Sequence, residues 1–236
     1  MRHAGPRRTL ETALVALALA GHAAAAARDP SGGGPWRVEL AGGVSNMQLG
    51  DVKDFYNGVL DTYRAGGVPI EPQREFPANL LIGGDVLYEV RPGVHVGVGA
   101  RYTWTHAYAL YGDPGGTLDV NSRMGLTTVA LVTRRSWPQA GSWAPFVDVR
   151  VGRGFVTIDE TETMVLTGAV TGSVEQGLSG HGNAPLAELH LGTGRALGPF
   201  IAIGAIGYRY CKVPGPPFDL DMSGFAATFV ISLTGR

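Results

Sequence analysis

The stretch that decides the fold is VHVGVGARYTWTHAY, residues 94–108. From Val94 to Trp104 every second residue is apolar, and the residues between them, such as Arg101, are polar or glycine. A strict period of two is the signature of a β-strand with one apolar and one polar face. This strand is about twice the usual length, and aromatic residues close its apolar face. Strands of about ten residues with these features are typical of transmembrane β-barrels.

Seven further segments alternate in the same way, and turn residues separate them. They are residues 36–44, 80–90, 118–132, 145–151, 186–194, 200–210 and 225–233. Long connections alternate with short ones, as the even-stranded barrels of outer membranes require. The sequence therefore predicts an all-β fold, an eight-stranded antiparallel up-and-down transmembrane β-barrel with a short helix in the first extracellular loop.

The composition argues against several other classes. The 236 residues carry a net charge of −1, which leaves no basic surface for nucleic acid. Mean hydropathy is +0.08, and past the N-terminal region no segment has about 18 consecutive apolar residues, as a membrane-spanning helix would need. A barrel hides its hydrophobicity in alternation, so these values are compatible with one.

The first 27 residues have the three regions of a secretory signal peptide. Arg2, Arg7 and Arg8 form a basic start, residues 10–20 are mostly apolar, and residues 23–27 offer alanine cleavage sites. We therefore expect residues 1–27 to be a signal peptide, residues 28–35 a flexible leader and residues 36–236 the barrel domain. Together with the barrel pattern, export of this kind predicts that the protein lies in the cell outer membrane.

Residues 46–78 form a long connection with a helical pattern. An apolar face recurs with the helical spacing i, i+3, i+4, and it consists of Val52, Phe55, Tyr56, Val59, Leu60 and Tyr63. Asp51 is the expected N-cap, and Gly66 with Gly67 is the expected end. This face either packs on the barrel mouth and the neighbouring loops or forms a lid or an apolar ligand entrance. Residues 157–183, rich in Gly, Thr and Glu, are expected to be a second long loop.

The polar faces of the strands predict a charged barrel interior. Ten side chains, five of each sign, are expected to face the lumen as a charge network: Arg37, Glu39, Asp85, Glu89, Arg101, Arg123, Asp148, Arg150, Glu188 and Arg209. We expect Arg101 to pair with Asp85 or with an acid on the side of strand 118–132, and Arg209 to pair with Glu188 or Glu39. Because a lone buried charge is strongly disfavoured, such pairs would plug the barrel.

The outward faces are expected to be apolar, with Val98 and Leu126 facing lipid. Arg153 interrupts the outward face of its strand, which predicts either a bulge at Gly152/Gly154 or the membrane edge. Aromatic residues cluster near strand ends, where amphipathic rings favour the two membrane interfaces. The predicted rims comprise Trp36, Tyr88, Tyr102, Trp104, Trp137, Trp143, Tyr208 and Tyr210.

From the first residues to the last strand the chain resembles the small eight-stranded outer-membrane β-barrel superfamily, which includes OmpX-, OmpW- and opacity-like proteins. The resemblance rests on YEVRPGVHVGVGARY, GPFIAIGAIGYRY and LDMSGFAATFVISL. It implies a fold but no particular activity. Such barrels commonly end in an aromatic residue that the assembly machinery reads, whereas this chain ends in LTGR. Phe229 and Leu233 are the alternative recognition residues.

The chemistry-bearing residues leave four functions open. A surface-interaction or structural barrel with a mostly closed interior is favoured, and a narrow OmpW-like conduit for small or apolar solutes is the alternative. A lipid-modifying enzyme lacks support, because neither His106 nor His190 has a serine two residues later, as the H-x-S motif of lipid A deacylases requires. Glu188 and His190 share a face and form either a proton-transfer pair or a satisfied lumen pair. A soluble lipocalin-like barrel would instead turn its apolar residues inward.

We therefore expect no enzymatic activity, no cofactor and no metal site, because the histidines have no metal-ligand spacing. The expected partners are the lipid bilayer, lipopolysaccharide and the outer-membrane assembly machinery, with no nucleic acid. The sequence does not identify an extracellular ligand.

Overall fold

The computed structural model describes residues 36–72, 78–137, 143–167, 171–197, 200–214 and 220–234. The expected signal peptide and leader lie outside these residues. The elements in chain order are β1 (Trp36–Ser45), α2 (Gly50–Ala65), β2 (Asn79–Arg91), β3 (Val94–Asp113), β4 (Gly116–Ser136), β5 (Trp143–Leu166), β6 (Gly172–Leu197), β7 (Phe200–Tyr210), β8 (Lys212–Val213), β9 (Leu220–Asp221) and β10 (Gly224–Thr234).

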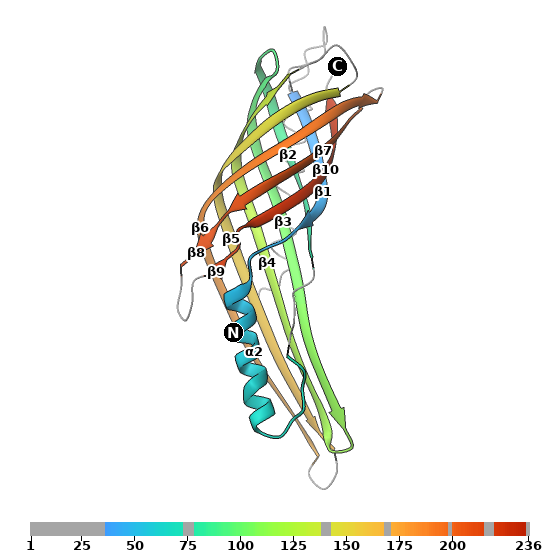
Figure 1. Cartoon of the computed structure of the whole chain (residues 1–236), viewed down its shortest axis with the longest axis vertical. Helices are drawn as coiled ribbons and strands as arrows, with labels where there is room; N and C mark the ends of the chain where they lie inside the picture. Colours follow the sequence, from blue (N-terminus) through green and yellow to red (C-terminus); the bar gives the residue numbers. More distant parts are fainter. Residues whose placement is uncertain are drawn as a thin grey trace.

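Eight antiparallel strands close into a barrel in the order β1-β10-β7-β6-β5-β4-β3-β2 (Figure 1). Every strand pairs with its sequence neighbour along the ring, and β1 pairs with β10 to close it. Strands β8 and β9 form a separate two-stranded ribbon. The predicted eight-stranded up-and-down barrel with a helix in the first connection is confirmed. Within the described part of the chain, no helix has the length and apolar character needed to cross a membrane.

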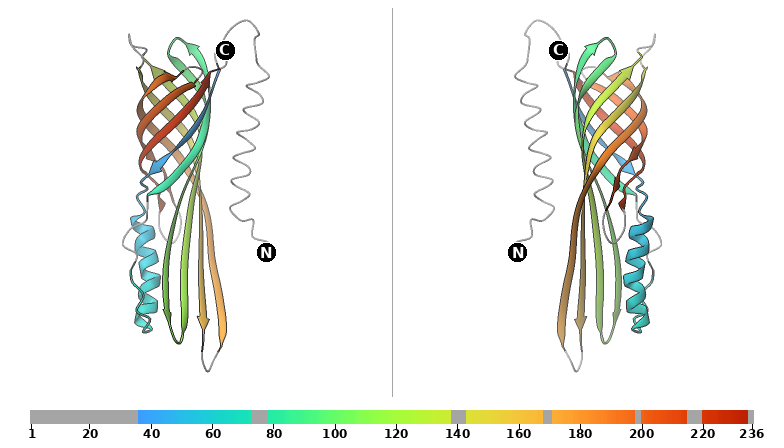
Figure 2. Two further views of the ribbon diagram at one scale, coloured as in Figure 1. Left: turned by 90° about the vertical axis from the view of Figure 1, so that its right-hand side faces the viewer. Right: turned by 90° about the vertical axis from the view of Figure 1, so that its left-hand side faces the viewer.

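Strands β3 to β6 are about twice as long as the other barrel strands and continue past one end of the barrel. Leu80 at the start of β2 pairs with Trp104, and Tyr210 at the end of β7 pairs with Ala187. We call the parts beyond these pairs, residues 105–124 and 156–186, the extension. Figure 2 shows that α2 runs alongside it.

The predicted loop over residues 157–183 was wrong, because β5 and β6 stay paired as far as Leu166 and Gly172. The alternating residues in this part of β5 are mainly Thr and Glu, so no apolar face indicated a strand. The ladder with β4, which runs from Gly116 opposite Leu166 without a register shift, fixes the strand instead.

The outer surface of the barrel is apolar on all eight strands. The exposed residues that form this belt are Leu40, Val44, Ile82, Val98, Val129, Leu131, Val149, Val151, Leu189, Leu191, Ile206, Phe229 and Ile231. Arg135 and Arg195 lie at the short-turn end of the belt, and Arg123 and Arg153 are exposed toward the extension. A lipocalin-like barrel would turn such a surface inward, so this chain has the opposite arrangement.

Strand β4 presents its faces the other way round from the prediction. Leu126 is fully buried inside and Arg123 is exposed, whereas Val129 and Leu131 are exposed in the belt. The sequence prediction was misled because both faces of this strand are apolar near residue 130. The apolar run from Leu118 onward packs inside the extension, and unbroken pairing then fixes the faces of the whole strand.

Helix α2 begins at Gly50 with Leu49 at the N-cap and no side-chain cap, so the prediction that Asp51 caps it was wrong. Its end at Gly66 and Gly67 is confirmed, and Gly67 has a φ of +91°, which a residue with a Cβ rarely adopts. Of the two alternatives predicted at Gly152/Gly154, the bulge was wrong, because β5 keeps its register with both neighbours there.

We expect Val98→Arg and Leu131→Arg each to destabilise the membrane-inserted barrel by about 2–4 kcal/mol, the cost of a cation at the lipid-facing midplane. Val98 and Leu131 pair with each other in the belt and are 52% and 69% exposed. Urea unfolding of the protein refolded into phospholipid vesicles measures this cost.

Leu110→Arg is the matched control, because Leu110 is also exposed on β3 but lies in the extension. It should change stability little. Equal stabilities for the wild type and Val98→Arg would mean that this surface does not face lipid.

Candidate functional site

The centre of the barrel interior is an ion pair between β5 and β2. Arg150 donates two hydrogen bonds to Asp85, with Nη1···Oδ1 at 2.7 Å and Nη2···Oδ2 at 2.6 Å. Its Nη2 also donates to Asp148 at 3.0 Å. All three side chains are buried. The two-pronged geometry matches the guanidinium fork to the carboxylate and is the strongest form of such a pair.

Arg134 extends this network toward the short-turn end of the barrel. Its two terminal nitrogens donate to Glu39 at 2.6 and 3.0 Å, and Nη2 also donates to Asp148 at 2.9 Å. The guanidinium lies 4.6 Å from the centre of the Phe146 ring. Arg134 therefore replaces Arg123 in the predicted network. The signal for it is the phase of β4, in which Arg134 shares the inward face with Leu126 and Val132.

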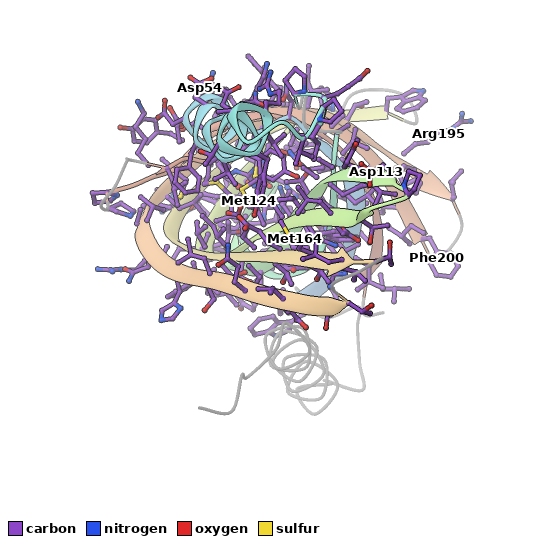
Figure 3. All side chains as sticks on the ribbon, turned by 90° about the horizontal axis from the view of Figure 1, so that it is seen from below. Asp54, Asp113, Met124, Met164, Arg195 and Phe200 are labelled. Carbon is purple, nitrogen blue, oxygen red and sulfur yellow. The ribbon has the colours of Figure 1, made fainter. Side chains whose placement is uncertain are left out.

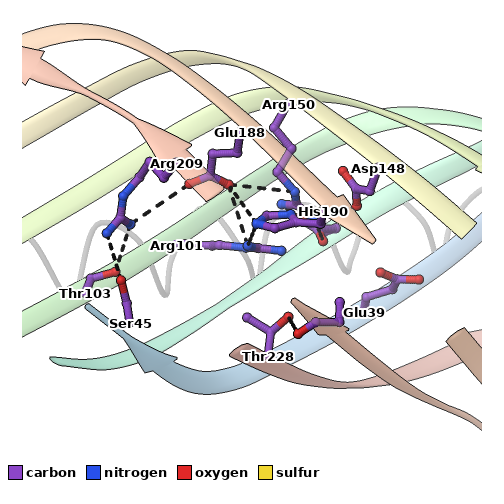
Figure 4. Close-up of polar contacts among 12 residues, drawn as sticks. Glu39, Ser45, Arg101, Thr103, Asp148, Arg150, Glu188, His190, Arg209 and Thr228 are labelled. Carbon is purple, nitrogen blue, oxygen red and sulfur yellow. Dashed lines mark hydrogen bonds and ion pairs between the residues drawn. The ribbon is translucent and has the colours of Figure 1, made fainter. Parts of the chain in front are cut away.

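Glu188 on β6 lies among four basic side chains (Figure 4). Its carboxylate is 3.6 Å from Arg101, 3.8 Å from His190 and 4.0 Å from both Arg150 and Arg209. The His190 Nε2 atom is also 3.3 Å from Nη1 of Arg101. Glu188 and His190 therefore belong to a shared network rather than to an isolated pair.

Arg209 is the member of the network nearest the extension. Its Nη1 and Nη2 atoms donate to Thr103 at 3.3 Å and Ser45 at 3.1 Å, and Nε donates to the Met222 carbonyl at 3.2 Å. The predicted pairing with Glu188 is thus present. Of the two partners predicted for Arg101, Asp85 is occupied by Arg150, and Arg101 pairs instead with Glu188 of β6, an acid on the β4 side of the ring.

The other predicted network residues lie at its margins or outside it. Arg37 is half-buried near the short-turn end. Glu89 is also half-buried and accepts a hydrogen bond from the Gly93 backbone in the β2–β3 turn, at 2.9 Å. Arg123 points outward and is exposed, which corrects its placement in the lumen. His95 was not predicted as part of the interior cluster and is buried there.

Glycine on the inward faces makes room for these long side chains. A Cβ at Gly99 would collide with the Asp85 carboxylate, and one at Gly207 would collide with the His190 ring. At both positions the contact would be so short that the neighbouring side chain would have to shift. The glycine on the neighbouring strand, paired with Asp85 in one case and with His190 in the other, therefore leaves the space that each of these side chains occupies.

An apolar layer lies next to Arg209, where the barrel interior meets the base of the extension. It consists of Met47, Leu49, Val52, Met124, Leu126, Ala130, Val156, Ala184, Leu186, Cys211, Val213 and Met222, all buried. Viewed from the extension end, Met124 lies inside the ring of strands (Figure 3). Two successive layers thus fill the interior: a layer of paired charged side chains and, next to it, a layer of apolar side chains.

Helix α2 packs against the extension through its buried face. Tyr56 and Leu60 join Leu118 and Val120 of β4 in a second apolar cluster, and the Tyr56 hydroxyl donates to the Val120 carbonyl at 2.9 Å. The Tyr63 hydroxyl donates to Glu162, and burial together with this carboxylate raises the pKa of Tyr63 to about 12. The helix therefore packs on the extension, as one of the two interpretations predicted.

A pocket of about 280 Å³ opens where α2, the extension and the β8–β9 ribbon meet. Most of its wall is apolar, with Val52 and Phe55 from α2, Ile158 from β5 and Leu220 from β9. Phe55 is partly exposed there, and Val59 is half-buried. The apolar face of the helix thus serves both packing and a cavity.

The predicted aromatic residues gather at the two ends of the belt. Trp36 and Tyr88 make an edge contact at 4.9 Å at the short-turn end. Trp137 and Trp143 are exposed in the strand ends there, and Arg195 lies over Trp143. At the other end, Tyr102 stacks on Trp104 at 5.4 Å and Tyr208 contacts Phe225 at 5.1 Å. Tyr210 is exposed beside Tyr208.

Several solved structures are similar to this chain in overall architecture. Neisserial surface protein A gives a TM-score of 0.46 at 10% identity, covering 86% of this chain and 99% of that one. The N-terminal β-barrel domain of Pseudomonas aeruginosa OprF gives 0.35 at 12% identity, covering 86% and 99%. Ail, the attachment invasion locus protein of Yersinia pestis, gives 0.34 at 11% identity, covering 84% and 95%.

No protein-family model and no curated protein sequence matches the chain. The resemblance to small outer-membrane barrels that the sequence indicated is found again among solved structures, at the level of the fold. The strand order of this chain establishes that fold by itself.

We expect Asp85→Ala to destabilise the barrel by about 3–5 kcal/mol, because it leaves the buried Arg150 without its main counter-charge. The double variant Asp85→Leu/Arg150→Met should be much milder, since both charges leave together and Asp148 keeps Arg134 as its partner. Unfolding free energies in detergent micelles give the comparison. A double variant as unstable as the single one would show that the pair itself, rather than charge balance, is needed.

Proposed function

We propose that this outer-membrane barrel is a surface-interaction protein whose interior is closed and whose extension and α2 are presented outside the cell. The observation that carries the proposal is the filling of the lumen. The paired charges around Arg150 and the apolar layer around Leu126 occupy successive levels of the barrel. An eight-stranded barrel is just wide enough for its own side chains.

The surface that could meet a partner is concentrated in the extension. Its strands carry exposed apolar residues beyond the belt, including Tyr108, Leu110 and Val174. Residues on segments that project from a rigid scaffold are commonly those that bind. The barrel then serves as the membrane anchor that holds this surface in place.

Contacts with the membrane follow from the same geometry. The belt would contact the bilayer, and the exposed Arg123 and Arg153 would lie near lipopolysaccharide phosphates at the outer rim. Phe229 and Leu233 are exposed on the closing strand β10, where the assembly machinery could read them. These three partners are proposals that rest on exposure and charge.

In planar bilayers we expect the purified protein to show no steady large conductance, because an ion would have to displace the Arg150–Asp85 pair and the apolar layer. The variant Asp85→Ala serves as the comparison and should raise the frequency of brief openings. Steady conductance of the wild type would favour the narrow conduit instead.

We expect Pro114→Cys to react with a membrane-impermeant maleimide on intact cells, because Pro114 lies at the exposed tip between β3 and β4. The matched variant Pro92→Cys lies in the β2–β3 turn at the opposite end and should react only after the outer membrane is permeabilised. The native Cys211 is buried, so the wild type gives the background. Labelling with the opposite pattern would reverse the proposed orientation.

A further inference from the structure

The pocket at the base of the extension has walls from four distant parts of the chain. Helix α2 supplies Phe55 and Tyr56, β5 supplies Ile158, β6 supplies residues 178–182, and the β8–β9 ribbon supplies Val213 and Leu220. Lys212 and Asp221, which are 3.2 Å apart, tie the two strands of the ribbon together. The pocket is therefore built by the tertiary fold and not by one loop.

Glu160 is the acidic group in this wall, and its carboxylate is poorly satisfied. Glu160 is only 7% exposed, and its Oε1 atom is buried with no hydrogen-bond partner. The nearby Tyr56 hydroxyl is directed to the Val120 carbonyl instead. Within the described part of the chain, no ion pair within 4.0 Å reaches Glu160.

The surroundings of Glu160 disfavour its charged form. Burial and the neighbouring Glu162 raise the pKa of its carboxyl group. Glu162 has its own partners, since it accepts hydrogen bonds from Tyr63 and Gln176. A buried acceptor without a partner costs free energy, and a cation that entered the pocket would remove that cost.

We propose that this pocket binds a small molecule with an apolar body and a protonated amine, and that the amine donates a hydrogen bond to the Glu160 carboxylate, which lines the pocket. The apolar walls around Ile158 and Leu220 take the body of the molecule. An ammonium–carboxylate hydrogen bond is roughly twice as strong as a neutral one, and partial burial strengthens it further. The pocket, at about 280 Å³, suits a ligand with a single ring or a short chain.

Glycines in the β6 wall allow the pocket to be blocked without disturbing the fold. A Cβ at Gly180 would meet no atom within 4 Å, whereas one at Gly182 would press on Val213. Because Gly180 lines the pocket and a Cβ there meets open space, a leucine at position 180 is expected to fill part of the pocket. Gly172, at the far end of the same strand, has equally open surroundings and does not line the pocket.

The test uses three probes with the same apolar body: 4-phenylbutylamine, 4-phenylbutanol and 4-phenylbutyrate. Binding to the full-length protein in lipid nanodiscs at pH 7.5 is measured by calorimetry, with empty nanodiscs subtracted. We expect the amine to bind about tenfold or more tighter than the alcohol, and the carboxylate to bind weakest, because Glu160 repels it.

Two variants separate charge from shape. Glu160→Gln should abolish the preference for the amine and leave the alcohol nearly unaffected, whereas Gly180→Leu should weaken both by about tenfold. Glu175→Gln and Gly172→Leu are the controls, since both positions are exposed on β6 outside the pocket. The shift in gel mobility on boiling verifies that each variant is folded. Equal binding of amine and alcohol to the wild type, or unchanged binding to Gly180→Leu, would overturn the proposal.

Discussion

The structure depends on the need to neutralise buried charge inside a narrow barrel. The idealised cost of moving one charged group from water into a protein interior is about 20 kcal/mol, and only close pairing offsets it. Arg150 meets this need through Asp85 on the opposite wall and Asp148 on its own strand. Asp85 lies on β2 and Arg150 on β5, and β3 and β4 stand between these two strands in the ring. The ion pair therefore links strands that share no backbone hydrogen bonds.

The same constraint explains why the two ends of the interior differ. Between Arg209 and the short-turn end, the inward faces are charged and the outward faces are apolar, as a lipid environment requires. From Arg209 toward the extension, the strands leave the belt, and their inward faces become apolar and pack against α2. The same alternation of faces thus continues through both parts of the long strands, and the change from charged to apolar inward faces occurs where β2 begins and β7 ends.

This transition also creates a concave surface with an apolar wall and an unsatisfied acid, Glu160. The barrel is the rigid base, the extension projects from it, and α2 closes one side of the pocket at Tyr56. A filled interior and an open pocket are compatible, because the apolar layer around Leu126 separates them. This arrangement agrees with the surface-interaction role that we propose.

The sequence by itself determined the barrel, its strand number, the faces of seven strands and the helix. Apolar residues at every second position mark a strand and apolar residues three to four positions apart mark a helix, and both patterns can be read within one short segment. It also determined seven of the eight charged side chains of the described interior network, all except Arg134, since side-chain direction follows from the face. Only the tertiary structure decided the phase of β4, where both faces are apolar, and thereby exchanged Arg123 for Arg134. The partner of Arg101 and the pocket around Glu160 likewise required the fold, because they join residues from strands and a helix that meet only when the barrel closes.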